Sequence, residues 1–110
     1  MTTNPDFLAE ELPFHAELLR QLANASRLHV CYLLAAAEHD VGTLAQKVGI
    51  SQSALSQHLA RLLQAGLVKV RRRSQNRFYR RDHPDVLKIL NLLSECHSAD
   101  RPFVEVELLN

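Results

Sequence analysis

Residues 41–81 contain two stretches in which apolar residues recur at helical spacing, followed by one stretch in which apolar and polar residues alternate. This order constrains the fold more than any other feature. Residues 41–48 have the spacing of a short helix. Gly49 can adopt the left-handed conformation that ends a helix, and Ser51 is a suitable N-cap for a second helix reaching Ala65. The sequence therefore predicts two helices joined by a tight glycine turn, which is the helix-turn-helix arrangement.

The packing of these two helices is predicted from the sizes and spacing of a few residues. Ala45 is small enough for a close helix crossing, and Ile50 is expected to point inward. The apolar residues of the second helix recur at helical spacing, at Leu55, Leu59 and Leu62. The opposite face of that helix is therefore predicted to be exposed.

After Gly66 the apolar residues no longer recur at helical spacing but at every second position, which predicts a β-hairpin. Apolar and polar residues alternate over residues 67–71, which form the first strand. Residues 74–76 form the turn, and residues 77–80 form the second strand. A basic hairpin after a helix-turn-helix motif is interpreted as a wing. The predicted fold is therefore mainly α, a winged helix-turn-helix of about five helices with a two-stranded wing.

Three further helices are expected outside this segment. The first covers residues 14–22, with Phe14 on its apolar face and Pro13 at its first turn. The second is capped by Asn24 or Ser26, and its helical pattern ends by Asp40.

The last helix opens at Pro84 and is apolar on more than one face, through Val86, Leu87, Ile89, Leu90, Leu92 and Leu93. Such a helix in a chain of 110 residues needs cover on two sides. The core of the domain can supply one cover and a second copy of the chain the other. We therefore expect a homodimer.

The length of 110 residues predicts one domain, assigned to residues 1–97, followed by an extended tail at residues 98–110. No stretch approaches the roughly 18 apolar residues of a membrane span, and the first residues lack the features of a secretory signal. We therefore expect a cytoplasmic protein that does not contact a membrane. In such a reducing compartment Cys31 and Cys96 are not expected to form a structural disulfide.

The net charge of +1 hides an uneven distribution of charged residues. Residues 41–81 contain no acidic residue, whereas the rest of the chain carries all 12 acidic residues. The basic residues of that segment are Lys47, Arg61, Lys69, Arg71, Arg72, Arg73, Arg77, Arg80 and Arg81. A basic segment between acidic ends indicates a polyanionic partner, which the helix-turn-helix identifies as double-stranded DNA.

The exposed face of the second predicted helix carries side chains suited to reading bases, since Gln can bond adenine and Ser a base edge or phosphate. We predict major-groove contacts from Gln52, Ser53, Ser56, Gln57 and His58. Phosphate or minor-groove contacts are predicted from Arg61, Arg71, Arg72, Arg73, Gln75, Asn76 and Arg77. Arg80 and Arg81 are set apart, because either can pair with Asp82 or Asp85.

Several motifs resemble the ArsR/SmtB family of winged-helix repressors over roughly residues 14–97. They lie at residues 22–28, 41–45, 51–59, 65–68 and 78–79. Within the family, residues 51–59 are most similar to the nodulation-gene repressor and sulfide-responsive biofilm repressor types. The resemblance implies a homodimer joined through its first and last helices, which binds an inverted-repeat operator and represses until a signal releases it.

Three alternatives for that signal follow from the resemblance. Sulfide-responsive members use two cysteines, matched by Cys31 and, about two residues early, by Cys96, so thiol oxidation or persulfidation is one alternative. Zinc-responsive members use ligands at both ends of the last helix, matched in part by His83, Asp85 and Cys96, with His97 or Asp100 as a substitute for the fourth ligand. Zinc would be the cofactor in that case. The third alternative is a constitutive repressor without a sensor.

Two other classes of function are weighed against the DNA-binding regulator. A winged helix can instead be a protein-interaction module, although such a module does not need a wing free of acidic residues. An enzyme is not indicated, because the sequence has no nucleophile–base pair, no glycine-rich phosphate loop and no catalytic metal spacing. The six histidines are scattered at His15, His29, His39, His58, His83 and His97.

Overall fold

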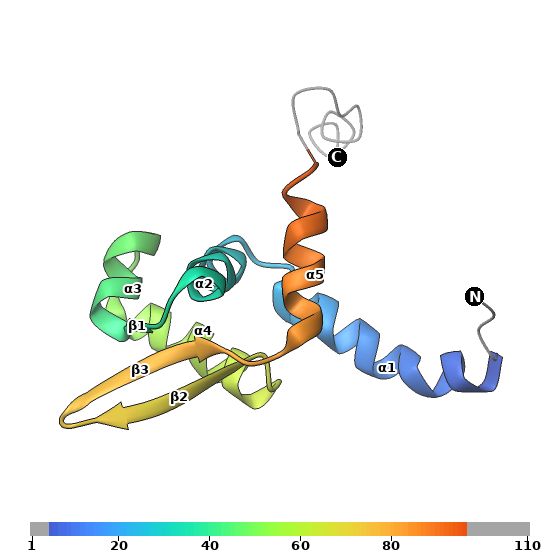
Figure 1. Ribbon diagram of the computed structural model, residues 1–110, viewed down its shortest axis with the longest axis horizontal. Helices are drawn as coiled ribbons and strands as arrows, with labels where there is room; N and C mark the ends of the chain where they lie inside the picture. Colours follow the sequence, from blue (N-terminus) through green and yellow to red (C-terminus); the bar gives the residue numbers. More distant parts are fainter. Residues whose placement is uncertain (1–4, 97–110) are drawn as a thin grey trace.

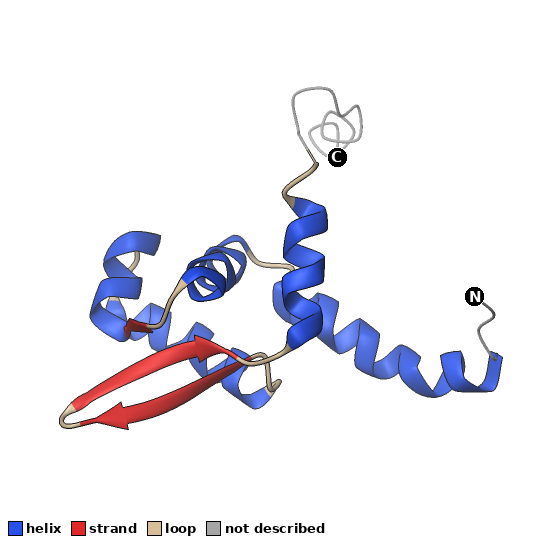
Figure 2. Cartoon of the chain, viewed as in Figure 1, coloured by secondary structure: helices blue, strands red, loops and turns tan. Residues whose placement is uncertain are grey.

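The computed structural model describes residues 5–96, and these form five helices and three strands (Figures 1 and 2). In chain order they are α1 (Pro5–Leu22), α2 (Ala25–Ala36), β1 (His39–Asp40), α3 (Val41–Val48), α4 (Gln52–Gln64), β2 (Val68–Arg73), β3 (Asn76–Arg81) and α5 (Pro84–Leu93). This order confirms the mainly α winged helix-turn-helix. The predicted tail at residues 98–110 lies outside the described residues.

Helix α2 lies at the centre of the fold, in contact with α1, α3, α4, α5 and β3. The leucine stripe predicted for α4 faces this centre, and Leu55, Leu59 and Leu62 are at most 1% exposed. Helix α5 closes the core with Val86 and Leu90. Each fully buried leucine contributes about 2 kcal/mol, so the polar face of α4 is held outward by the burial of its opposite side.

The turn between α3 and α4 has the predicted conformation. Gly49 has a φ of 84°, and its N–H donates to the carbonyl of Ala45 over 2.8 Å. Ser51 caps α4 by accepting from the N–H of Ala54, and Asp40 caps α3 in the same way through Thr43. The start of α4, where the first side chains predicted to read DNA lie, is therefore fixed by local hydrogen bonds.

The wing is longer than predicted, and its turn is shorter. Strands β2 and β3 pair antiparallel from Val68 opposite Arg81 to Arg73 opposite Asn76, so Asn76 is a strand residue and not part of the turn. The remaining turn has two residues, and Ser74 takes a φ of 61°. Two-residue hairpin turns need positive φ because their backbone then matches the strand twist.

A third strand, β1, was not predicted from the sequence. His39 pairs with Tyr79 and Asp40 with Phe78, which places β3 between β1 and β2. Two residues are too few to show an alternating pattern. This short strand joins the wing to the start of α3.

Helix α1 differs most from the sequence prediction. It begins at Pro5, so Pro13 lies inside it and not in its first turn. Pro13 removes a single helical hydrogen bond, and the leucine, alanine and glutamate residues before it favour a helix. Phe14 is 44% exposed and not part of the core, and its ring stacks on that of His83 at 5.7 Å.

Helix α1 extends away from the body on the side opposite to the wing, and α5 stands over its C-terminal end (Figure 1). Within residues 5–96, none of the helices is both long and apolar enough to pass through a lipid bilayer.

Candidate nucleic-acid interface

The exposed face of α4 carries polar and basic side chains from one end of the helix to the other. Gln52, Ser53, Ser56, Gln57 and Arg61 are all exposed. None of them is acidic, and together they offer donors and acceptors but no negative charge. The structure thus brings together on one helix face five of the residues predicted from the sequence.

Gln52 lies against the first turn of α3. A Cβ atom at Gly42 would come within 3.4 Å of the Gln52 Nε2 and 3.3 Å of the Asp40 Oδ2. A side chain at position 42 would therefore contact Gln52 and come tightly against the carboxylate of Asp40, the N-cap of α3. Sequence reasoning did not single out Gly42, because this close approach depends on how α3 and α4 cross.

His58 differs from the other predicted major-groove residues because it is only partly exposed and has a partner inside the protein. Its Nδ1 lies 3.3 Å from Nη1 of Arg27, a buried residue of α2. A guanidinium only donates, so Nδ1 accepts and the ring proton is on Nε2. Burial, and then the charges of Arg27 and Arg61, lower the pKa of His58. Only Nε2 is therefore left for a partner such as DNA.

The far end of the wing carries three arginines whose side chains make no ion pair or hydrogen bond within residues 5–96. They are Arg72, Arg73 and Arg77, and Gln75 and Asn76 are exposed beside them. Arg72 lies directly opposite Arg77 in the hairpin. Like charges in opposite positions destabilise a hairpin, and a polyanion would remove that cost. This arrangement is suited to binding phosphates.

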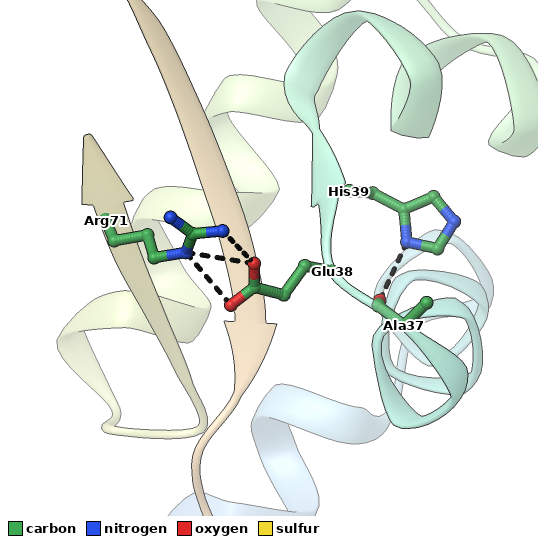
Figure 3. A network of polar contacts seen from close by, with 4 residues as sticks. All are labelled: Ala37, Glu38, His39 and Arg71. Atoms are coloured by element: carbon green, nitrogen blue, oxygen red, sulfur yellow. Dashed lines mark hydrogen bonds and ion pairs between the residues drawn. The ribbon is translucent and has the colours of Figure 1, made fainter. Parts of the chain in front are cut away.

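Arg71 differs from these three arginines because its charge is already paired. Its Nη2 donates to Glu38 over 2.7 Å and its Nε over 2.9 Å (Figure 3). The guanidinium also lies over the ring of Phe78, 5.4 Å from the centroid. The hydrogen bond from Arg71 lowers the pKa of Glu38, which therefore stays ionised. Glu38 lies before the acid-free segment in the sequence and was not predicted to contact the wing.

The Glu38→Gln variant is expected to bind DNA several-fold more tightly than the wild type, because it frees Arg71 for a phosphate. One more phosphate contact would steepen the plot of log affinity against log salt by about 0.9. Fluorescence anisotropy in a salt series measures both quantities. The matched control is Glu95→Gln, an exposed residue after α5. Weaker binding by Glu38→Gln would mean that Arg71 acts only when Glu38 holds it.

The pairing considered for Arg80 and Arg81 is wrong. Asp82 pairs with Lys69 over 3.3 Å and Asp85 pairs with Lys88 over 3.6 Å. Arg80 and Arg81 are both exposed on β3. They therefore add to the positive charge of the wing base.

The two cysteines differ in exposure. Cys31 is 3% exposed, and burial raises the pKa of its thiol to about 11, against a smaller opposing effect of Arg27. At pH 7 on the order of one Cys31 in 10,000 is then a thiolate. Cys96 is exposed beyond the end of α5. A thiol sensor using both residues would therefore require a conformation that uncovers Cys31.

Iodoacetamide at neutral pH is expected to label Cys96 and leave Cys31 unlabelled in the folded protein. Only the thiolate reacts, and Cys31 is both protonated and covered. Mass spectrometry of peptides after a timed reaction measures each site, and the unfolded chain provides the control in which both cysteines react. Equal labelling in the folded protein would show that Cys31 is accessible.

The residues matched to zinc ligands do not converge in the described chain. His83 caps α5 and accepts from the N–H of Asp85 over 3.2 Å, whereas Cys96 lies beyond the other end of this ten-residue helix. A helix of that length spans about 15 Å. Within residues 5–96 no three His, Cys, Asp or Glu side chains are grouped closely enough for a metal ion, and His97 lies outside this range. A zinc site shared between two protomers stays a prediction.

Helices α1 and α5 expose large apolar side chains. Leu19 is 58% exposed and Leu92 65% exposed, and the other members of this surface are Leu8, Leu12 and Leu93. An apolar groove runs beside them, lined by Leu19, Leu22, Ala23, Leu28, Ile89 and Leu93. These residues form what we call the α1–α5 surface. None of its residues belongs to α4.

Comparison with known proteins agrees with this geometry. The sequence profile of the bacterial regulatory proteins of the arsR family matches residues 24–70, which include α2, α3 and α4. The chain is 44% identical over 96 residues to the nodulation protein NolR of Rhizobium meliloti, covering 87% of this chain and 79% of that protein. It is 37% identical over 78 residues to the biofilm growth-associated repressor of Xylella fastidiosa, covering 71% and 68%.

Solved structures resemble the fold over most of the chain. Reduced HlyU from Vibrio cholerae superposes with a TM-score of 0.76 at 36% identity, covering 82% of this chain and 97% of that one. A homodimeric winged helix-turn-helix DNA-binding domain from Mycobacterium bovis gives a TM-score of 0.72 at 32% identity, covering 86% and 87%. The matched family is one of bacterial regulatory proteins and not of enzymes, and among the relatives HlyU is named a transcriptional activator and the biofilm protein a repressor. The chain belongs to the ArsR family of DNA-binding transcriptional regulators.

Proposed function

We propose that this regulator is a repressor that binds an inverted-repeat operator as a homodimer. Helix α4 of each protomer enters the major groove, where Gln52, Ser53, Ser56 and Gln57 contact base edges. Arg61 and the three unpaired arginines at the far end of the wing, Arg72, Arg73 and Arg77, contact phosphates or the flanking minor groove. The observation that carries this proposal is that neither α4 nor the two wing strands contain an acidic residue, so the polar face of α4 and the far end of the wing present only neutral and positive side chains.

The homodimer is proposed from the α1–α5 surface. Side chains such as Leu19 and Leu92 are costly to leave in water, and the same surface on a second copy would cover them. A relative from Mycobacterium bovis is described as homodimeric. Two-fold symmetry then matches an inverted repeat whose half-sites lie about one helical turn, roughly 34–36 Å, apart.

The test is fluorescence anisotropy of the reduced, metal-free protein on DNA from upstream of its own gene and on a random duplex. We expect tighter binding to the upstream DNA, and a dimer by analytical ultracentrifugation. Equal, weak binding to both duplexes would contradict operator recognition. Absence of binding to either would favour a protein-interaction module. Because one relative, HlyU, is named a transcriptional activator, a reporter assay then separates repression from activation.

The releasing signal has three alternatives, and inorganic polysulfide and zinc added to the same assay separate them. Release by polysulfide that is lost in Cys31→Ser and Cys96→Ser variants would identify a thiol sensor. Release by zinc would indicate a metal site completed by the partner protomer. Binding that neither reagent changes would support a constitutive repressor.

A further inference from the structure

Arg27 connects three helices through one guanidinium group. The residue is 9% exposed, and it lies in the first turns of α2. Its Nε donates to the carbonyl of Gln21 and its Nη2 to that of Arg20, both in the last turn of α1. Carbonyls in the last turn of a helix lack partners within that helix, so Arg27 caps α1. Its remaining contact is Nη1 to His58 of α4.

The contact between Arg27 and His58 fixes the protonation state of the imidazole ring. Nδ1 can accept only while His58 is neutral, since protonation would place a second donor and a second positive charge 3.3 Å from Arg27. The charged groups around the ring are Arg27 from α2 and Arg61 from α4. Glu17 of α1 interacts with Arg61 but is hydrogen-bonded to Arg20 and Gln21. The ring is therefore surrounded mainly by positive charge, which keeps it neutral.

We propose that His58 is a positioning residue of the DNA-reading helix, which it ties through Nδ1 and Arg27 to the C-terminal end of α1. Helix α1 carries part of the α1–α5 surface. The tie thereby sets where each α4 lies relative to the dimer axis, and hence the distance between the two α4 helices. An inverted repeat demands a fixed distance of this kind. This inference rests on the proposed function, because it requires an operator-bound dimer.

Two isosteric variants separate a positioning role from a direct DNA contact. In His58→Asn the side-chain oxygen occupies the place of Nδ1, so the variant keeps the acceptor for Arg27 and loses Nε2. In His58→Gln the amide lies at the distance of Nε2, so the variant keeps an outer polar group and loses the acceptor. Both variants are made in the full chain and measured on the upstream DNA and on the random duplex.

We expect His58→Asn to keep an operator affinity within about threefold of the wild type, and His58→Gln to lose about tenfold, the cost of one hydrogen bond to a charged group. Binding to the random duplex should change little in either variant, since phosphate contacts do not depend on the α4 spacing. The ratio of the two affinities cancels any loss of folded protein, because unfolded chains are missing from both measurements.

The opposite ranking would overturn the proposal, since retained affinity in His58→Gln and loss in His58→Asn would mean that Nε2 contacts DNA. Equal loss in both variants, or none in either, would also overturn it. Failure of the wild type to prefer the upstream DNA is a different result, and it contradicts the proposed function. A pH series adds a second readout. Because the pKa of His58 is lowered, the ring should become protonated only below the pH range usual for histidine, and wild-type operator affinity should fall there, whereas His58→Asn should lack this change.

Discussion

The double variant Arg72→Ala, Arg73→Ala is expected to bind all DNA sequences about a hundredfold more weakly at roughly 0.1 M salt. Each arginine at the end of the wing releases about 0.9 counterions when it meets a phosphate, so the slope of log affinity against log salt should fall by about 2. The ratio of operator to random affinity should change little, because phosphate contacts carry no base information. An anisotropy salt series on both duplexes measures all three quantities.

This loss is expected without unfolding of the wing. Arg72 lies opposite Arg77, so its removal relieves a like-charge pair, and the free energy of unfolding should stay within about 0.5 kcal/mol of the wild type. The matched control is Lys88→Ala, which removes an exposed positive charge from α5, outside the wing. An unchanged salt slope in the double variant would contradict the assignment of the hairpin as a DNA-binding wing.

The Leu19→Glu variant is expected to be monomeric and to lose about two orders of magnitude in operator affinity. Leu19 is 58% exposed in the single chain, so the change should leave the monomer folded while placing a charge in the proposed interface. Loss of the second half-site removes the gain from bivalent binding, which is typically about 10²–10⁴-fold. Analytical ultracentrifugation and anisotropy measure the two effects.

The matched control for this variant is Leu19→Met, which keeps an apolar side chain of similar volume and should remain dimeric. Leu92→Glu, at an even more exposed position of α5, tests the same surface independently. A dimeric Leu19→Glu variant with unchanged affinity would place the interface elsewhere. Circular dichroism of each variant confirms that the fold is retained.

The elements that the sequence predicts well are those specified by neighbouring residues. The bounds of α3, the glycine turn at Gly49 and the Ser51 cap all agree with the structure. Capping and turn formation act within a few residues, so their signals are local. The position of the wing could be predicted because the spacing of apolar residues changes from helical to alternating after Gly66. Its length did not, because the turn at Ser74 is set by pairing across the strands.

The contacts that the sequence did not predict join residues about thirty positions apart. Arg27 meets His58 across a separation of 31 residues and Arg71 meets Glu38 across 33. Neither pair has a local signal, because the packing of α2 against α4 creates the first and the pairing of β1 with β3, beside β2, creates the second. One clue was available for His58, which lies only about 60° around the helix from Leu55 and therefore at the edge of the buried stripe.

The basic surface of α4 and the wing also has a consequence for how fast this regulator finds its site. With a net charge of only +1, the chain as a whole is attracted weakly to DNA, but residues 41–81 hold nine of its 13 Lys and Arg residues and none of its 12 acidic residues. The electrostatic field of the duplex therefore orients an approaching molecule so that this surface faces the DNA, which raises the association rate at low ionic strength. The same attraction holds the protein on unrelated sequences, so the fraction of time spent at the operator depends on competition with the rest of the genome.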